Sequence, residues 1–246
     1  ESFQNPLNNF ETNIGGSINL LEWLRAKRKK IKVVFITSDK CYQPSKKAHS
    51  EEDKLGGLDP YSSSKSIQEI LIKSYYYSFF SKKNFIKIAT ARSGNIYGGG
   101  DFTPGRLVPD IMNSVFRKEK LIIRNPYHVR PWQYITDSII GYINIAQYLS
   151  YSSSFESFNF GPSQSSCISV KNLTEKIETI NNLKLIISNS KKINFKENES
   201  LRLISKKAKK LLNWKNNFNL DSGLKETYLW YENYFKDPKN IVDYTQ

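Results

Sequence analysis

One short segment, Ile31–Ile36, constrains the fold more than any other part of the sequence. Its residues form a nearly continuous apolar run that is rich in β-branched side chains. Such a run is typical of a strand covered on both faces, as in a parallel sheet. The polar sequence Thr37-Ser38-Asp39-Lys40 follows directly. We therefore expect polar groups at the carboxyl end of a buried parallel strand, where α/β folds place their ligands.

The neighbouring segments predict helices and a second strand around this one. Residues 13–30 have the apolar spacing of a helix and end in a basic run that suits the negative end of its dipole. Asp59 can cap a second helix over residues 60–80, with Pro60 in its first turn. Phe85–Ala91 predicts a second strand. This order indicates an α/β fold with a Rossmann-like, doubly wound parallel sheet.

The second half of the chain predicts a mixed lobe of short elements. From about residue 103 we expect a helix over Leu107–Arg117, a strand over Leu121–Ile123, a helix capped by Asp137 and reaching about Leu149, a strand and turn over Phe158–Gly161, a helix capped by Ser169, and core anchors at Leu211, Trp214, Leu224 and Trp230. The predicted domains are therefore residues 1–102, the sheet domain, and residues 103–246, a smaller mixed α/β lobe with some segments returning to the first domain.

A glycine-rich phosphate loop is absent from the sequence. Nucleotide-binding α/β folds normally open with a strand, a glycine-rich turn and a helix that receives the pyrophosphate. Here Gly15-Gly16 lies within the first predicted helix, and Gly98–Gly100, after a late strand, predicts a tight turn. We therefore expect that the first βα units of the fold are missing, as in a gene fragment or truncated reading frame.

Composition and charge exclude several classes of function. The formal charge of +14 comes from 37 basic against 23 acidic residues, and lysine runs such as Lys27–Lys30, Lys191-Lys192 and Lys206–Lys210 carry much of it. Because no zinc-finger spacing or aromatic-interleaved RNA-binding pattern accompanies them, a solvated basic surface is favoured over a nucleic-acid site. The apolar runs are too short to cross a bilayer, and the first residues carry no export signal.

The few cysteines and histidines argue against metal and disulfide chemistry. Cys41 and Cys167 form no Cys-x-x-Cys pair, and His49 and His128 have no ligand-like spacing. A zinc site and a Ser-His-Asp hydrolase are disfavoured. We therefore predict no bound metal. Because no disulfide framework is indicated, we also predict a location in the reducing cytoplasm.

Two short motifs carry candidate chemistry. Tyr61 and Lys65 stand four residues apart on a predicted helix, so the ammonium can lower the pKa of the phenol and make it a base. Alone, such a pair is more often accidental. Asp39 and Lys40 place an acid beside a potential base, which is what an elimination of water needs, although alone they would more often form a solvated turn.

Together these motifs resemble the extended short-chain dehydrogenase/reductase family, and within it the CDP-glucose 4,6-dehydratases. Related dTDP-glucose enzymes usually have glutamate where Lys40 stands. The stretches that carry the resemblance are Thr37–Tyr42, Asp59–Lys65, Arg92–Asp101, Arg106–Ile111, Ile123–Pro126, Arg130–Gln133, Asn159–Pro162 and Trp230-Tyr231. They cover nearly the whole chain in order, which is more specific than any single motif.

The resemblance implies NAD as cofactor and an internal redox elimination. Tyr61 would take the proton of the sugar 4-hydroxyl with help from Ser38 and Lys65. Lys40 would then remove the C5 proton while Asp39 protonates the departing 6-hydroxyl. Lys40 can act so only if burial or nearby positive charge favours its neutral form; otherwise it orients Asp39 or stabilises the enolate.

Further binding roles follow from the same resemblance. It places Asn13, Ser93, Tyr61 and Lys65 beside the cofactor, although Asn13 could equally cap its helix. The residues implied for the nucleotide sugar, with CDP-glucose as the expected substrate, are Asn95, Arg106, Arg124, Asn125 and Arg130. Relatives pair into dimers through the helices at residues 13–30 and 60–80, which predicts a homodimer.

Other interpretations stay open at this stage. A sugar-nucleotide 4-epimerase shares the tyrosine–lysine pair and NAD but does not need Asp39 and Lys40. A dehydratase for GDP-mannose or dTDP-glucose, a non-catalytic remnant that lacks the cofactor loop, and a nucleic-acid-binding protein are further alternatives.

Overall fold

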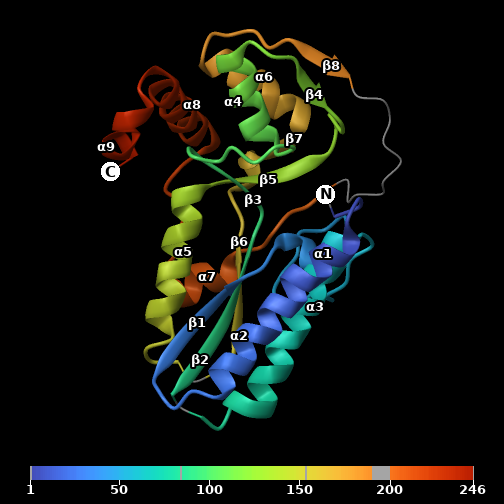
Figure 1. Cartoon of the computed structure of the whole chain (residues 1–246), viewed down its shortest axis with the longest axis vertical. Helices are drawn as coiled ribbons and strands as arrows, with labels where there is room; N and C mark the ends of the chain where they lie inside the picture. Colours follow the sequence, from blue (N-terminus) through green and yellow to red (C-terminus); the bar gives the residue numbers. More distant parts are fainter. Residues whose placement is uncertain (1, 84, 153, 190–199, 246) are drawn as a thin grey trace. The chain divides into compact units, whose positions relative to one another are not determined.

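The computed structural model describes residues 2–83, 85–152, 154–189 and 200–245 (Figure 1). Apart from the residues outside these ranges, the chain forms two compact units. Unit 1 comprises residues 1–94, 138–161 and 196–215, and unit 2 comprises residues 95–137, 162–195 and 216–246. The first segment of unit 1 thus ends at Gly94 rather than at the predicted residue 102, and two later segments return to it. The predicted lysine run Lys191-Lys192 lies outside the described residues.

Unit 1 is built on a parallel sheet of three strands in the order β1-β2-β6. These are β1 (Ile31–Ile36), β2 (Ile86–Ser93) and β6 (Glu156–Phe160). Ile36 pairs with Ala91 and Ser93 with Phe160, so all three strands run in one direction. The predicted Rossmann-like parallel sheet is confirmed.

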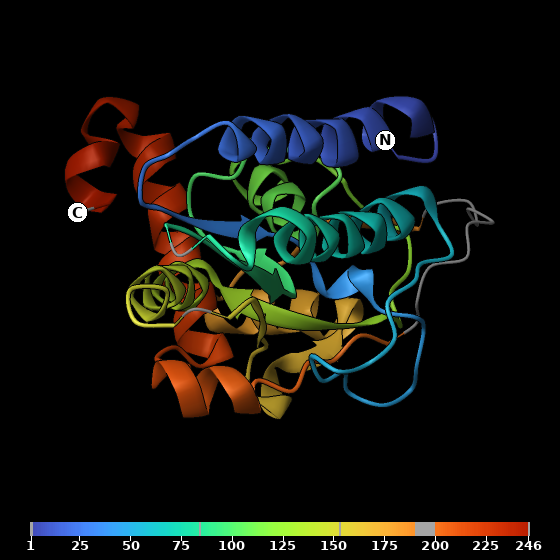
Figure 2. The same cartoon turned by 90° about the horizontal axis from the view of Figure 1, so that it is seen from below.

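Helices cover both faces of this sheet (Figure 2). One face carries a helix made of α1 (Pro6–Phe10), the π-helical turn η1 (Glu11–Gly15) and α2 (Gly16–Arg25), beside α3 (Pro60–Tyr75) with its π-helical extension η3 (Tyr76–Phe80). The other face carries α5 (Ile135–Tyr148) and α7 (Lys206–Leu212). Separate apolar clusters fill the two sides, one around Leu21, Leu24 and Ile72, the other around Phe158, Phe160 and Trp214.

The first helix differs from its prediction at both ends. It begins at Pro6, because the Asn5 side chain accepts a hydrogen bond from the backbone N–H of Asn8 (3.3 Å) and so caps it. It ends at Arg25, which leaves the basic run Lys27–Lys30 outside the helix. The alternative that Asn13 caps this helix is wrong, since Asn13 lies inside the π-helical turn.

In its described residues, unit 2 contains two small sheets. The first has the order β3-β5-β7, with β3 (Asn95–Tyr97) parallel and β7 (Cys167–Ser169) antiparallel to β5 (Val129–Tyr134). The second pairs β4 (Leu121–Ile123) with β8 (Ile187–Asn189) in parallel. The other elements are α4 (Leu107–Arg117), η4 (Gln164–Ser166), α6 (Val170–Ile180), α8 (Leu220–Lys236), η5 (Pro238–Asn240) and α9 (Ile241–Thr245). Of these, α4, α6 and α8 pack around one core that includes Ile111, Trp132 and Leu224.

Three details of the second half differ from expectation. Asp137 lies in the first turn of α5 rather than before it, and its buried carboxylate accepts from the backbone N–H groups of Asn217 (3.0 Å) and Phe218 (3.3 Å). On α7 the buried leucine is Leu212, while Leu211 is exposed. Trp230 is only partly buried. Ser169 does cap its helix, accepting from the N–H of Asn172 (3.1 Å).

The glycine run Gly98–Gly100 makes close packing and a turn. A Cβ on Gly99 would collide with the indole of Trp230, and Gly100 has a φ of +81°. Glycine is therefore needed here for backbone approach and conformation, in agreement with the predicted tight turn.

Within the described ranges, no helix combines the length and apolar character that a membrane crossing needs.

Candidate functional site

The centre of the candidate site is Tyr61, in the first turn of α3. Asp59 caps this helix by accepting from the N–H of Ser62 (3.0 Å), and Pro60 stands in the first turn, so the local sequence places Tyr61 at the helix start. The Nζ of Lys65, one turn on, lies 5.8 Å from the centroid of the Tyr61 ring. The Nζ of Lys40 lies 5.7 Å from the same centroid. The ring is therefore close to two ammonium groups, one from α3 and one from the loop after β1.

The loop after β1 is held against α3 by side-chain hydrogen bonds. Asp39–Cys41 form a 3-10 turn, η2, which Ser38 caps by accepting from the N–H of Lys40 (3.2 Å). The Ser38 hydroxyl donates to Oδ1 of Asp39 (3.1 Å), and both residues are buried. Ser66 of α3 donates to the carbonyl of Cys41 (2.8 Å). The structure thus brings together all five predicted catalytic residues.

Asn13 and Lys65 belong to a chain of hydrogen bonds between the first helix and α3. Asn13 Nδ2 donates to the hydroxyl of Ser64 (3.0 Å), which donates to the carbonyl of Tyr61 (2.8 Å). Lys65 Nζ donates to Oε1 of Gln68 (3.2 Å). Burial lowers the pKa of Lys65 below its ordinary value. Asn13, 51 residues from Ser64 in sequence, is thereby linked to the helix that carries Tyr61.

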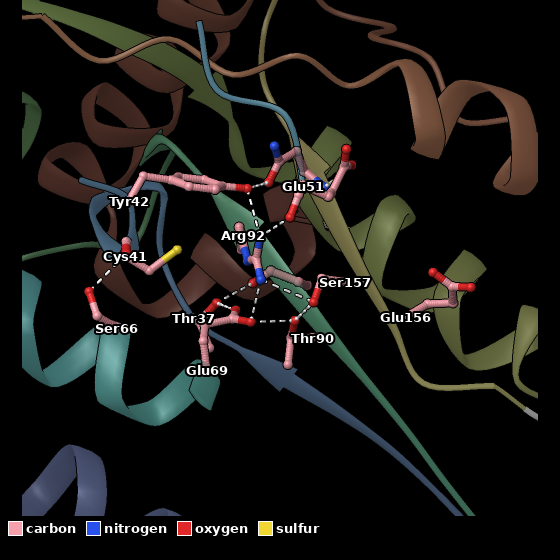
Figure 3. A network of polar contacts seen from close by, with 12 residues as sticks. Thr37, Cys41, Tyr42, Glu51, Ser66, Glu69, Thr90, Arg92, Glu156 and Ser157 are labelled. Atoms are coloured by element: carbon pink, nitrogen blue, oxygen red, sulfur yellow. Dashed lines mark hydrogen bonds and ion pairs between the residues drawn. The ribbon is translucent and has the colours of Figure 1, made fainter. Parts of the chain in front are cut away.

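A buried ion pair joins α3 to strand β2 of the sheet (Figure 3). Glu69 and Arg92 approach to 2.6 Å between Oε2 and Nη2, and their side chains are 1% and 4% exposed. The Glu69 carboxylate also accepts from Thr37 (2.5 Å) and Thr90 (2.9 Å). Because Thr37 follows β1 and Thr90 lies in β2, this carboxylate ties α3 to two strands at once.

Arg92 extends the network to the loop that follows η2. Its Nη1 donates to the hydroxyl of Tyr42 (2.7 Å), which donates to Asn159 of β6 (2.7 Å). Burial is the largest single influence on the pKa of Arg92 and lowers it, but the hydrogen bond and the negative charge of Glu69, with smaller contributions from other neighbours, together outweigh burial and raise this pKa. Burial also raises the pKa of the Cys41 thiol, which keeps this cysteine protonated and unreactive.

Ser93, at the carboxyl end of β2, completes the candidates in unit 1. It is buried, and its hydroxyl lies 2.8 Å from the hydroxyl of Tyr142 on α5. All predicted catalytic and cofactor residues therefore belong to unit 1.

All predicted substrate residues belong to unit 2. Arg106 is exposed and pairs with Asp101 (3.1 Å), while the exposed Arg124, which follows β4, donates to the carbonyl of Gly105 (2.9 Å) and so contacts the loop that carries Arg106. Arg130 is different, because it is buried in β5 and its guanidinium lies 3.0 Å from Nδ1 of His128. Asn95 in β3 and Asn125 before β5 are half-buried.

Sequence reasoning missed Gln68, Glu69 and Arg92 as site residues. A signal for Arg92 was present, since it directly follows the apolar strand predicted over Phe85–Ala91, at the carboxyl end where α/β folds place their ligands. Glu69 stands one helical turn after Lys65 and was its natural companion on that face. In the part of the chain that the structure describes, no three His, Cys, Asp or Glu side chains gather as metal ligands do.

Comparison with known proteins gives consistent relatives. Residues 1–227 match the model of the family described as GDP-mannose 4,6 dehydratase. A CDP-glucose 4,6-dehydratase of Salmonella typhimurium is 37% identical over 187 residues, which is 73% of this chain and 52% of that protein. A UDP-glucose 4-epimerase of Oryza sativa is 28% identical over 247 residues, covering 94% of this chain and 59% of that protein. The chain therefore spans between half and three-fifths of the length of these relatives.

A solved structure has the same fold. The dTDP-glucose 4,6-dehydratase of Bacillus anthracis, determined in complex with NAD, superposes with a TM-score of 0.75 at 23% identity, over 94% of this chain and 71% of that one. At this identity the likeness supports the Rossmann-like architecture and does not identify a substrate.

Proposed function

We propose, since this chain belongs to the GDP-mannose 4,6 dehydratase family of extended short-chain dehydrogenases/reductases, that it carries out the NAD-dependent dehydration of a nucleotide sugar. The proposed reaction converts CDP-glucose to CDP-4-dehydro-6-deoxyglucose and water. The observation that carries the proposal is that the ammonium groups of Lys65 and Lys40 lie 5.8 and 5.7 Å from the centroid of the Tyr61 ring, with the buried Asp39 next to Lys40 in η2.

In the first proposed step Tyr61 takes the proton of the sugar 4-hydroxyl. Two ammonium groups near the ring favour its phenolate form, because opposite charges within a few ångströms stabilise an anion. Lys65 is suited to this role, since its half-buried ammonium is less screened by water than a surface lysine. Ser38, on the neighbouring loop, would donate a hydrogen bond to the same sugar oxygen.

In the second proposed step the 4-ketone acidifies the C5 proton and water is lost. Asp39 would protonate the departing 6-hydroxyl while Lys40 removes the C5 proton or stabilises the enolate. Support comes from their adjacency in η2, where Ser38 bonds to both residues. General acid and base groups of this kind typically contribute about 10²–10⁴-fold each.

NAD, when bound, would accept hydride from C4 and return it to C6, while C5 regains the proton that it lost, so that no net oxidation occurs. The residues present fit such a cofactor. Lys65 uses one of its three N–H donors on Gln68, which leaves donors for the hydroxyls of a ribose. Asn13, Ser93, Tyr61 and Lys65 are the proposed contacts of this chain with NAD.

CDP-glucose is the proposed substrate for two reasons. Lys40 stands where related dTDP-glucose enzymes usually have glutamate, and the 37% identical relative is a CDP-glucose 4,6-dehydratase. The diphosphate would be bound by arginines of unit 2, because a guanidinium can hold phosphate oxygens in a bidentate manner. Arg106 and Arg124 are both exposed and are suited to this, since Arg124 contacts the loop that carries Arg106. Asn95, Asn125 and Arg130 are proposed as further contacts. A 4-epimerase is the second candidate, favoured by the 28% identical relative.

Product analysis separates these functions. The full-length protein is incubated with NAD and, in parallel, CDP-glucose, dTDP-glucose, GDP-mannose and UDP-glucose, and the products are identified by NMR. We expect a 4-keto-6-deoxy sugar from CDP-glucose and much less from the other three. Recovery of a C4 epimer, or of unchanged CDP-glucose, would refute the proposal.

The proposal includes a homodimer formed through α2, α3 and η3. Large apolar side chains are exposed along these helices, among them Trp23, Ile67, Ile70 and Tyr77. Ile70→Lys should convert the dimer to a monomer in sedimentation velocity. Ile143→Lys, a change at an equally exposed isoleucine of α5, should leave it dimeric; a monomeric wild-type protein would contradict this part.

Both cysteines are free thiols, which fits the proposed cytoplasmic location.

A further inference from the structure

Gln68 is a buried amide whose two ends are both hydrogen-bonded. Its Oε1 accepts from Lys65 Nζ (3.2 Å), and its Nε2 donates to the hydroxyl of Ser17 on α2 (2.8 Å). Ser17 in turn donates to the carbonyl of Asn13 in the π-helical turn (2.7 Å). The contact with Ser17 spans 51 residues of sequence, so this amide connects the Lys65 ammonium to the neighbouring helix.

The charged and titratable groups around Lys65 come from two elements. Tyr61 and Glu69 lie on α3, and Lys40 and Cys41 lie on η2. Burial lowers the pKa of Lys65, while the negative charge of Glu69 acts in the opposite direction. The Glu69 carboxylate is directed elsewhere, into its bonds with Thr37, Thr90 and Arg92. The hydrogen-bonded partner of Lys65 is therefore neutral.

A neutral acceptor has a different effect from a carboxylate. An amide oxygen fixes the position of an ammonium group without cancelling its charge, whereas a carboxylate at the same distance forms an ion pair and raises the pKa of the lysine. An ammonium whose charge is uncompensated stabilises a phenolate beside it more strongly than one that is paired with a carboxylate. Gln68 and Glu69, adjacent in sequence, therefore have different roles. Gln68 holds the Lys65 ammonium, and Glu69 anchors α3 to the sheet.

We propose that Gln68 is a positioning residue, which holds the Lys65 ammonium beside Tyr61 through a neutral acceptor fixed to α2 by Ser17. This inference rests on the proposed function, because Tyr61 and Lys65 are its proposed catalytic pair. In this proposal Gln68 determines how strongly the Lys65 ammonium stabilises the Tyr61 phenolate.

The test measures the protonation of Lys65 directly. The protein is trace-labelled with acetic anhydride over a series of pH values, and acetylation at each lysine is quantified by peptide mass spectrometry, since only neutral amines react. For Gln68→Glu we expect labelling of Lys65 to slow about tenfold at a fixed pH, which corresponds to a pKa raised by about one unit. For Gln68→Leu, which removes a hydrogen bond to the charged form, labelling should become faster.

Gln147→Glu is the matched control, because it makes the same chemical change at an exposed position of α5 on the other face of the sheet (Figure 2). It should leave Lys65 labelling unchanged. Equal Lys65 profiles in Gln68→Glu and in the control would overturn the proposal. Gln68→Glu is nearly isosteric with the wild-type side chain. Its Lys65 labelling profile therefore tests the proposal even where Gln68→Leu does not fold.

Activity gives an independent readout that separates this inference from the proposed function. In the full-length enzyme, Gln68→Glu should move the acidic limb of the kcat/KM profile to higher pH, because less positive charge acts on Tyr61. Labelling requires no turnover. A shifted Lys65 profile without dehydratase activity would contradict the proposed function alone, and dehydratase activity with an unshifted profile would contradict the role of Gln68 alone.

Discussion

The Glu69–Arg92 pair should be among the most sensitive points of unit 1 to a single substitution. Both side chains are almost fully buried and approach to 2.6 Å. Removing one partner leaves the other charge buried without compensation, which typically costs about 3–5 kcal/mol. For a chain of 246 residues a loss of this size lowers Tm by roughly 6–20 °C. We therefore expect Glu69→Leu and Arg92→Leu each to destabilise unit 1 strongly.

The double variant Glu69→Leu/Arg92→Leu should cost less than the sum of the single changes. It removes both charges together, and replacing a buried ion pair by apolar residues is often close to neutral. The hydroxyls that lose a partner each keep a second one: Thr37 keeps the carbonyl of Ala91 (3.3 Å), Thr90 keeps Ser157 (2.8 Å) and Tyr42 keeps Asn159 (2.7 Å). A coupling of a few kcal/mol should therefore appear in the double-mutant cycle.

Urea unfolding followed by far-UV circular dichroism measures these changes, with the midpoint shifting at an unchanged m-value. Arg25→Leu is the matched control, since Arg25 and Glu22 form the same type of pair at 2.7 Å on the exposed face of α2. It should have no measurable effect on the midpoint. Additive single variants, or single variants as mild as this control, would refute the reasoning.

Further outcomes follow from the site. Tyr61→Phe should lower kcat of the full-length enzyme by about 10²–10⁴-fold with little change in Tm, because Tyr61 is only half-buried; retained turnover would exclude it as the base. Burial lowers the pKa of Lys65 below its ordinary value of 10.5, so between the folded and unfolded pKa values the unfolded chain binds more protons and wild-type stability rises with pH. The stability of wild type relative to Lys65→Met, measured by urea unfolding, should therefore increase from neutral pH towards pH 10.5, and a constant difference would contradict this. Cys167 should react with a thiol reagent well before Cys41, which is fully buried and has a raised pKa; equal rates in a mass-spectrometric time course would show that the site opens readily.

Much of unit 1 could be predicted because its signals are local. The apolar run of β1 and the cap and proline at the start of α3 involve residues within a few positions of each other. The pairing of Tyr61 with Lys65 is equally local, since four residues make one helical turn. Each of these predictions is confirmed in the structure.

Predictions failed where a distant partner decided the outcome. Asp137 looked like a helix cap, but its carboxylate is taken by backbone groups 80 and 81 residues away. Asn13 looked like a cap because the preceding turns of its helix, which begin at Pro6, have little apolar periodicity. On α7 the leucine that enters the core is set by the position of the helix against the sheet, which its short sequence does not specify.

The sequence by itself determined the type of fold, the order of the elements in unit 1 and the presence of a tyrosine–lysine pair, because periodicity, capping and turn chemistry act over a few residues. Only the tertiary structure decided what surrounds that pair. The Lys40 ammonium near the Tyr61 ring, the bond that fixes Gln68 to Ser17, and the Glu69–Arg92 pair arise from contacts between elements far apart in sequence. Their electrostatic effect depends on burial and distance, which are set when the helices pack on the sheet.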